Sequence, residues 1–163
     1  MKTLLIVWHS RTGGTRQMAQ AAAEAARAEA AVMTRYLAAP EVDPEHLLAA
    51  DGYLFCAPEN LAALSGAMKD FFDRCYYPVL GRINGRPYGL LICAGSDGTN
   101  AARQAARIAT GWRLRAVAEP LVVCTHAQTP EAILAPKVIA AKDLDKCRML
   151  GTTLAAGLAM GVF

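Results

Sequence analysis

The chain has 163 residues, which suits one domain with one sizeable core. Hydrophobic residues make up 54% of it and charged residues 19%, the composition of a folded rather than a disordered protein. The net charge of +3 is spread along the chain without a clustered basic run, which argues against a nucleic-acid partner. The apolar stretch 150–163 is interrupted by glycines and is shorter than the roughly 20 residues of a membrane span, so we predict no span.

The five cysteines form no C-x-x-C pair and no metal-ligand spacing, so we predict no metal site. An odd number of cysteines without a secretory segment is typical of reduced thiols, and we expect a cytoplasmic protein. Cys56, Cys93 and Cys124 each lie in an apolar run, where a free thiol behaves as a small hydrophobic side chain.

Strand-like and helix-like segments alternate from one end of the chain to the other. The first, Thr3–Trp8, is a continuous apolar run typical of a strand that is covered on both faces. In chain order we predict strand Thr3–Trp8, helix Gly13–Ala30, strand Val32–Leu37, a short helix within Pro40–Ala50, strand Asp51–Cys56, helix Leu64–Tyr77, a polar connector Arg82–Pro87, strand Tyr88–Ala94, helix Asn100–Trp112, strand Arg115–Cys124 broken by Pro120, and one long helix or two joined helices from about Ala135 to Leu158. This alternation predicts a single α/β domain over residues 1–163, a doubly wound five-stranded parallel sheet with helices on both faces.

The segment after the first strand has the composition of an anion site. Ligands of such sheets bind beyond the carboxyl ends of the strands. Glycine lets backbone N–H groups approach a phosphate closely, and the positive end of the following helix attracts it. An ordinary N-cap needs only one Ser or Thr, whereas this loop has three hydroxyls and no acidic residue. We predict a phosphate-binding loop formed by Ser10, Arg11, Thr12, Gly13, Gly14 and Thr15.

The loop belongs to neither of two common nucleotide motifs. No Gly-Lys-Ser/Thr follows it, as a Walker motif requires, and it does not fit G-x-G-x-x-G. These absences argue against ATP and against a conventional dinucleotide fold, and they narrow the ligand to a mononucleotide.

Three segments, in order, carry a resemblance. Ser10-x-Thr12-Gly13-x-Thr15 resembles the FMN phosphate loop of the flavodoxin superfamily. Residues 57–61, with the helix start at 65–73, resemble the segment that packs on the flavin ring in the NAD(P)H-dependent FMN and quinone reductases of that superfamily. Residues 94–100 resemble their fourth-strand loop, which borders the pyrimidine edge of the ring. The resemblance implies a flavodoxin-like strand order of 2-1-3-4-5 and FMN as the cofactor.

A flavin ring also sets its own requirements on these loops, namely backbone polar groups at one edge and little bulk over the face. Pro58 stiffens one loop, and Gly95 and Gly98 admit close backbone approach in the other. An ordinary turn, with a helix cap by Thr99 or Asn100, is the alternative interpretation. The resemblance implies ring contacts from Pro58, Glu59, Asn60 and Leu61 and from Gly95, Ser96, Asp97 and Gly98.

The departures from electron-transfer flavodoxins favour an enzyme. Those proteins usually sandwich the flavin between aromatic side chains, whereas this chain has Asn60-Leu61 and Ser96-Asp97 at the corresponding positions. Those proteins are also strongly acidic, whereas this chain has a net charge of +3. Open ring faces suit a nicotinamide or a quinone. We predict an FMN-dependent oxidoreductase that uses NAD(P)H to reduce quinones or other small acceptors, with no catalytic side chain because the chemistry belongs to the flavin. A flavodoxin-type electron carrier and a non-catalytic binding module are the alternatives.

The sequence does not decide the roles of two histidines and of one aromatic cluster. His9 precedes the phosphate loop and is either a phosphate contact or structural, and His126 lies near the same rim. Reductases of this kind often complete the flavin site at a dimer interface, so the resemblance implies a homodimer or tetramer. The aromatic end of the third main helix would form either such an interface or core, through Phe71, Phe72, Tyr76 and Tyr77.

Overall fold

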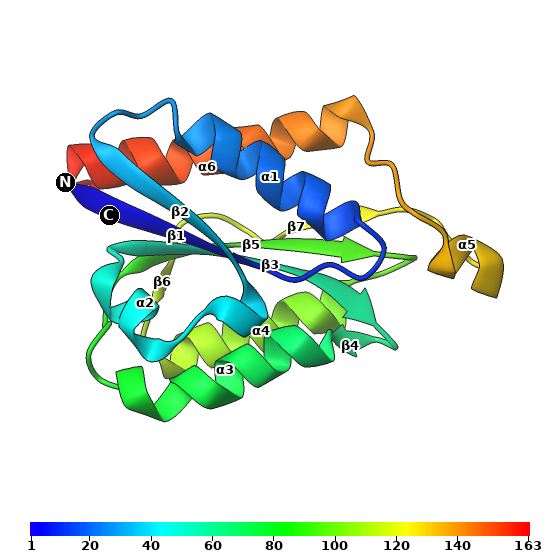
Figure 1. Cartoon of the computed structure of the whole chain (residues 1–163), viewed down its shortest axis with the longest axis horizontal. Helices are drawn as coiled ribbons and strands as arrows, with labels where there is room; N and C mark the ends of the chain where they lie inside the picture. The colour runs from blue at the N-terminus through cyan, green and yellow to red at the C-terminus, as the bar shows by residue number, and fades with distance from the viewer.

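The computed structural model describes residues 1–163 and shows a parallel sheet between two layers of helices (Figure 1). Its strands are β1 (Lys2–Trp8), β2 (Val32–Ala38), β3 (Gly52–Asn60), β4 (Ala63–Leu64), β5 (Pro87–Ala94), β6 (Arg115–Ala116) and β7 (Leu121–Cys124). The main order is β2-β1-β3-β5, and β6 and β7 both pair in parallel with β5. The predicted fifth strand is therefore two short strands along one edge, because Pro120 lies in the break between them. With these two taken as one, the predicted order of 2-1-3-4-5 is confirmed.

Helices cover both faces of the sheet, as predicted. They are α1 (Gly14–Ala26), the 3-10 turn η1 (Ala39–Glu41), α2 (Pro44–Ala49), α3 (Gly66–Val79), α4 (Thr99–Gly111), α5 (Pro130–Leu134) and α6 (Ala141–Met160). Helices α1 and α6 lie side by side on one face, and α3 and α4 lie on the other (Figure 1). The short helix begins at Pro44 because the Asp43 side chain accepts a hydrogen bond from the His46 N–H at 3.2 Å.

The continuous apolar runs of the central strands serve two separate cores, because successive side chains of a strand point to opposite faces. In β3, Tyr53 and Phe55 belong to a core of 25 buried residues under α3 and α4. Leu54 and Cys56 belong to a core of 20 buried residues under α1 and α6. Both faces of the sheet are therefore buried away from solvent, which explains why these strands contain almost no polar residues.

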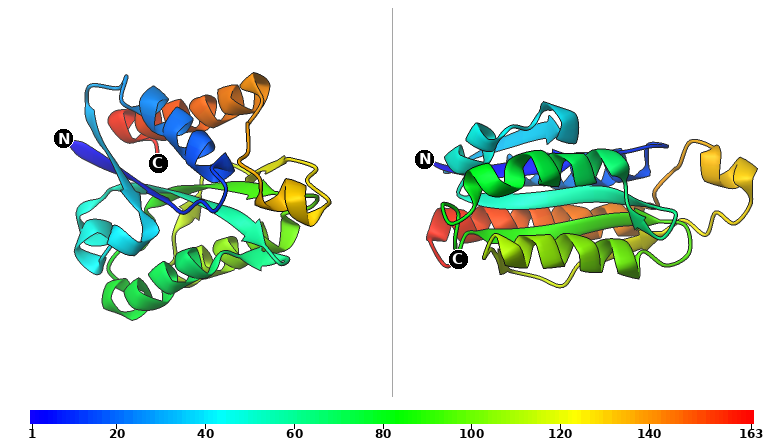
Figure 2. Two further views of the ribbon diagram at one scale, coloured as in Figure 1. Left: turned by 45° about the vertical axis from the view of Figure 1, so that its right-hand side comes forward. Right: turned by 90° about the horizontal axis from the view of Figure 1, so that it is seen from below.

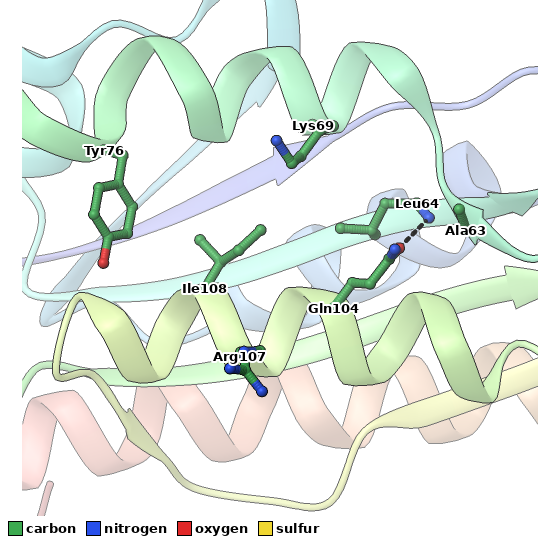
Figure 3. A pocket seen from close by; sticks show the side chains of 7 residues that line it. All are labelled: Ala63, Leu64, Lys69, Tyr76, Gln104, Arg107 and Ile108. Carbon is green, nitrogen blue, oxygen red and sulfur yellow. Dashed lines mark hydrogen bonds between the residues drawn. The ribbon is translucent and has the colours of Figure 1, made fainter.

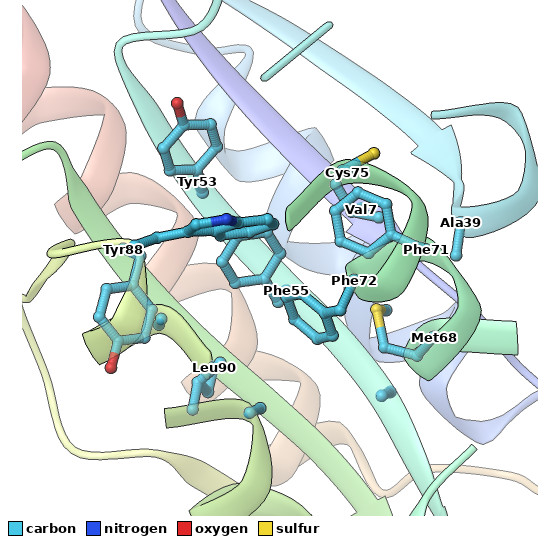
Figure 4. Close-up of a cluster of buried hydrophobic side chains, with 14 of the residues drawn as sticks. Val7, Ala39, Tyr53, Phe55, Met68, Phe71, Phe72, Cys75, Tyr88 and Leu90 are labelled. Atoms are coloured by element: carbon cyan, nitrogen blue, oxygen red, sulfur yellow. The ribbon is translucent and has the colours of Figure 1, made fainter. Parts of the chain in front are cut away.

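The aromatic end of α3 divides between core and surface, and Figure 4 shows its core part, Phe71 and Phe72. The rings of Phe55 and Phe72 meet edge to face with 5.3 Å between their centroids. Phe71 and Phe72 are 0% and 1% exposed, so they are core residues and cannot contribute to an interface. Tyr77, by contrast, is 79% exposed.

The prediction of helix from Ala135 onward is wrong for residues 135–140, which separate α5 from α6. Pro136 has no N–H and keeps Ala135 out of the helical region, where its ψ is 150°. Helix α6 begins only at Ala141. The first helix is also shorter than predicted, since Gly13 is left-handed (φ 92°) and the helix ends at Ala26.

The residues predicted as a second loop lie mostly in a strand. Strand β3 continues through Asn60, and the chain reverses at Leu61 and Ala62 into the antiparallel strand β4. Both turn residues have positive φ, at 50° and 62°, as a tight two-residue hairpin turn requires. The sequence does not reveal this turn, because neither position carries the Gly or Asn that usually marks it.

The strands β1, β3, β5 and β7 all end at one edge of the sheet, on the right of Figure 1. Helix α5 projects beyond that edge, away from the two layers (Figure 2). No helix has both the length and the apolar character that crossing a bilayer requires.

Candidate functional site

A cavity of about 570 Å³ opens at the carboxyl edge of the sheet, within the range of about 300–1,000 Å³ typical of small-molecule sites. All but three of the predicted site residues line it: Ser10, Arg11, Thr12, Gly14, Thr15, Pro58, Glu59, Asn60, Leu61, Gly95 and Ser96. Gly13, Asp97 and Gly98 do not line it. Three segments that are far apart in sequence therefore surround one space.

The loop between β1 and α1 presents unpaired backbone donors. The Ser10 Oγ accepts a hydrogen bond from the Gly13 N–H at 3.0 Å, which closes the turn. Gly13 has a φ of 92°, a conformation that suits glycine. The backbone N–H groups at Arg11, Thr12, Gly14, Thr15 and Arg16 donate to no group of the protein. Such a set of donors at the start of a helix is a ready site for an anion.

Thr15 supplies a further free group in the same loop. Its side chain is 1% exposed, and its hydroxyl oxygen has no hydrogen-bond partner although it is buried. A buried unpaired hydroxyl is costly, so it calls for a ligand atom. The first turn of α1 contains no acidic side chain, so the positive end of the helix is left uncompensated.

The floor of the loop permits no side chain at Gly14. A Cβ added there would lie 2.6 Å from the Cys93 Sγ, which requires the thiol or the loop to move. Burial raises the pKa of Cys93 to about 11, so this thiol stays protonated at neutral pH. Cys93 therefore acts as packing beneath the loop, in line with the sequence interpretation.

His9, just before the loop, is held by the neighbouring segment. Its Nδ1 lies 2.8 Å from the hydroxyl oxygen of Ser65, a fully buried residue at the start of α3. Burial and the nearby Arg11 lower the pKa of His9 below its usual value. His9 does not line the cavity, and the contact with Ser65 gives it a structural role.

The β3–β4 hairpin forms a second wall of the cavity. Pro58, Glu59 and Asn60 end β3, and Leu61 at the tip of the turn is fully exposed. The hairpin is fixed from α4, because Asn100 donates to the Ala62 carbonyl at 2.6 Å.

The third wall follows β5 at residues 95–98. Gly98 has a φ of 79°, and a Cβ there would lie 2.7 Å from Val122, so the position is packed from behind. The Asp97 side chain turns back to the Thr99 hydroxyl. These contacts explain why Asp97 and Gly98 support the loop without lining the cavity. Gly98 itself precedes α4 as its N-cap, so neither Thr99 nor Asn100 caps the helix as the alternative interpretation held.

A fourth wall escaped the sequence analysis. It comes from the chain after β7 and from α5, and it includes Thr125, Ala127, Pro130, Ile133, Leu134 and Lys137. Ala62, Cys93 and Ala94 also line the cavity. The signal that marks α5 is the pair Thr129-Pro130: the Thr129 Oγ1 accepts from the Ala132 N–H at 3.2 Å, and proline suits the first helical position.

The charge of the lining is small and the lining has no aromatic ring. Arg11 and Lys137 are its two cations and Glu59 is its one carboxylate. No Phe, Tyr, Trp or His side chain lies among the lining residues. His126, which was expected near this rim, is exposed and does not line the cavity.

A second hollow, of about 480 Å³, lies between α3 and α4 (Figure 3). It contains none of the predicted site residues. Its Gln104 accepts a hydrogen bond from the Leu64 N–H at 2.8 Å and so braces β4 from behind. The hollow therefore borders the hairpin that forms one wall of the main cavity.

A parallel sheet of order 2-1-3-4-5, with a phosphate-type loop after its first strand and a cavity at its carboxyl edge, defines the flavodoxin-like class. Within that class, the family model described as NADPH-dependent FMN reductase matches residues 1–129, and the chain belongs to this family. The resemblance drawn from the three sequence segments is thereby confirmed.

The known proteins similar to this chain include both a flavodoxin and an NAD(P)H dehydrogenase (quinone). A flavodoxin from Aquifex aeolicus is 36% identical over 97 residues, which are 60% of this chain and 50% of that protein. An NAD(P)H dehydrogenase (quinone) from Acidithiobacillus ferrooxidans is 30% identical over 94 residues, 45% of this chain and 47% of that protein. The matches thus span about half the length of these relatives. Among solved structures, a flavodoxin from the domain Archaea superposes with a TM-score of 0.78 at 17% identity, over 97% of this chain and 99% of that one.

Proposed function

We propose that the protein binds FMN in the cavity and uses NAD(P)H to reduce quinones or other small acceptors, with residues 1–163 acting as a single domain. The observation that carries this proposal is the lining of the cavity. At one end of the cavity, unpaired backbone N–H groups are available to donate hydrogen bonds to a phosphate. The rest of the lining contains no aromatic side chain.

The phosphate loop fits the FMN phosphate. Five unpaired N–H groups and the buried hydroxyl of Thr15 offer donors, and the Ser10 O–H is free to add another. The positive end of α1 and the nearby Arg11 favour a doubly charged anion. These groups would hold the phosphate and set the position of the rest of the cofactor.

The other walls fit a flat ring with one polar edge. The backbone N–H groups of Gly95, Ser96 and Asp97 have no partner in the protein and would serve that edge. Pro58 and Ala94 offer apolar contact in the same cavity. The flavin, once bound, supplies the hydride-transfer chemistry, and this chain's part is to bind it, orient it and leave one face accessible.

An accessible face is what separates an NAD(P)H-dependent enzyme from an electron carrier. A nicotinamide and a quinone must each come into stacking contact with the flavin, and an aromatic side chain over the ring would occupy that space. The lining has none. Arg11 and Lys137 place positive charge at the cavity, which attracts a phosphate-bearing nicotinamide cofactor.

The second candidate is electron transfer without nicotinamide turnover, as the resemblance to the Aquifex aeolicus flavodoxin suggests. One experiment separates the two. Purified protein is saturated with FMN, its FMN affinity is measured by fluorescence, and oxidation of NADPH and NADH is followed with a quinone and with ferricyanide. We expect tight FMN binding and steady turnover. A stabilised blue semiquinone with negligible nicotinamide oxidation would support the carrier, and no change in FMN fluorescence would refute both.

A further inference from the structure

The segment 127–139, here called the α5 strap, crosses the mouth of the cavity. It runs from the end of β7 through α5 to the start of α6, and it projects beyond the sheet in Figure 2. Ala127, Pro130, Ile133, Leu134 and Lys137 of the strap all line the cavity. No residue of α5 itself is buried, and of the strap only Ile139, at its end, belongs to a core.

Both ends of the strap are tied to the cavity's other walls. At its start, the neighbouring His126 donates its N–H to the Gly95 carbonyl at 2.8 Å. At its end, the Lys137 N–H donates to the Thr12 carbonyl at 2.8 Å, and the Gln17 amide bonds the Lys137 carbonyl at 2.7 Å and the Ile139 N–H at 3.1 Å. The strap is thus anchored to the phosphate loop at one end and to the loop that follows β5 at the other.

The middle of the strap forms an apolar rim with the hairpin. Ile133 and Leu134 line the cavity and are nevertheless 50% and 62% exposed, and Leu61 from the hairpin is fully exposed. Three large apolar side chains from two separate segments therefore face water around one opening. Apolar surface of this kind, at the mouth of a cavity, is typical of a ligand contact.

The position of the rim assigns it to a second ligand. The phosphate loop and the unpaired N–H groups at 95–97 provide the polar contacts that FMN needs, and they lie on the walls to which the strap is tied. We infer that the α5 strap is the apolar wall of the acceptor site, and that the acceptor is a planar, uncharged, apolar quinone. This inference rests on the proposed function. Reduction of such a quinone to its hydroquinone consumes two electrons and two protons, of which NAD(P)H supplies a hydride and water the other proton.

The test measures binding without turnover. Oxidised, FMN-loaded protein is titrated with 1,4-naphthoquinone, and the perturbation of the flavin absorbance gives the quinone affinity. Ile133→Ser and Leu134→Ser are each expected to weaken quinone binding about tenfold, as loss of apolar contacts in a half-open site does. Val138→Ser is the matched control, because Val138 is 90% exposed on the same strap and does not line the cavity. It should leave quinone binding unchanged.

Two further measurements keep the inference separate from the proposed function. The FMN affinity of all three variants should equal that of the parent protein, and reoxidation of the reduced protein by ferricyanide, a hydrophilic acceptor, should keep its rate. A loss of FMN affinity in Ile133→Ser or Leu134→Ser would assign the rim to the cofactor and overturn the inference. So would equal quinone binding by all variants, while FMN binding and NADPH oxidation persist. Absence of FMN binding by the parent protein would instead overturn the proposed function, and the inference with it.

Discussion

The carboxylate of Glu59 accepts a hydrogen bond from the backbone N–H of Gly98, with 2.6 Å between the two heavy atoms. The bond joins the hairpin wall of the cavity to the loop that follows β5, across 39 residues of sequence. Gly98 is left-handed and packed against Val122 from behind, so Glu59 is the contact that holds this loop from the cavity side. Together with the His126 N–H, which donates to the Gly95 carbonyl, this bond holds the unpaired N–H groups at 95–97 in position.

Replacing Glu59 by Ala should loosen this loop. A hydrogen bond to a charged group contributes about 1.5–3 kcal/mol, and the partly exposed position of Glu59 favours the lower end of that range. We expect the FMN affinity, measured by fluorescence titration, to fall about tenfold. Glu41→Ala is the control, because the Glu41 carboxylate also accepts from a backbone N–H, that of Ala38 at 3.1 Å, and does not line the cavity. Equal FMN affinities in the two variants would contradict the role of Glu59.

Thr15→Val should change stability and ligand affinity in opposite directions. The unpaired buried hydroxyl costs the free protein about 1–3 kcal/mol, and valine keeps the shape of the side chain without it. We expect the free energy of unfolding of the FMN-free protein to rise, by urea titration, while the FMN affinity falls about tenfold. Thr34→Val removes the other unpaired buried hydroxyl, on β2, and should raise stability alone. A Thr15→Val protein that binds FMN normally would show that the phosphate lies elsewhere.

Gln17→Ala should release the α5 strap. The Gln17 side chain bonds the carbonyls of Gly13 and Lys137 and the N–H of Ile139. Loss of three bonds, at about 0.5–1.5 kcal/mol each, should lower the free energy of unfolding by about 2 kcal/mol. Hydrogen exchange should also accelerate over the strap, residues 127–139. Gln20→Ala is the control, since the amide of Gln20 bonds only Glu24 on the same helix. Unchanged hydrogen exchange in the strap would show that the Gln17 side chain is not what holds the strap.

His9 should make the protein less stable in mild acid. Burial and Arg11 lower the pKa of His9 in the folded protein below the unfolded value of 6.5. Below that value the unfolded chain binds more protons, so stability that is complete above pH 6.5 is lost as the pH falls toward the lowered pKa. Urea unfolding at about pH 7.5 and about pH 5.5 should show a smaller loss for His9→Gln than for the parent. Identical losses would mean that His9 titrates alike in both states.

Much of the sheet and the phosphate loop was predictable because their signals are local. The apolar run of β1 and the glycine and hydroxyl residues after it occupy consecutive positions, and their physical consequences depend on near neighbours. The same holds for the short helix predicted within Pro40–Ala50, because its N-cap Asp43 and the proline that follows lie side by side in the sequence. The second and third segments were found only through their resemblance to a family, because a Pro or a Gly after a strand is common in ordinary turns.

The sequence by itself determined the alternation of strands and helices, the coverage of the sheet on both faces and the place of the phosphate loop. Only the tertiary structure decided which side chains complete the cavity. Gln17 and Lys137 are 120 residues apart, and Glu59 and Gly98 are 39 apart, so no local spacing encodes either contact. The α5 strap shows the same limit most clearly. The residues of its helix α5 are exposed and follow no core periodicity, and they become wall residues only because the folded phosphate loop holds the end of the strap.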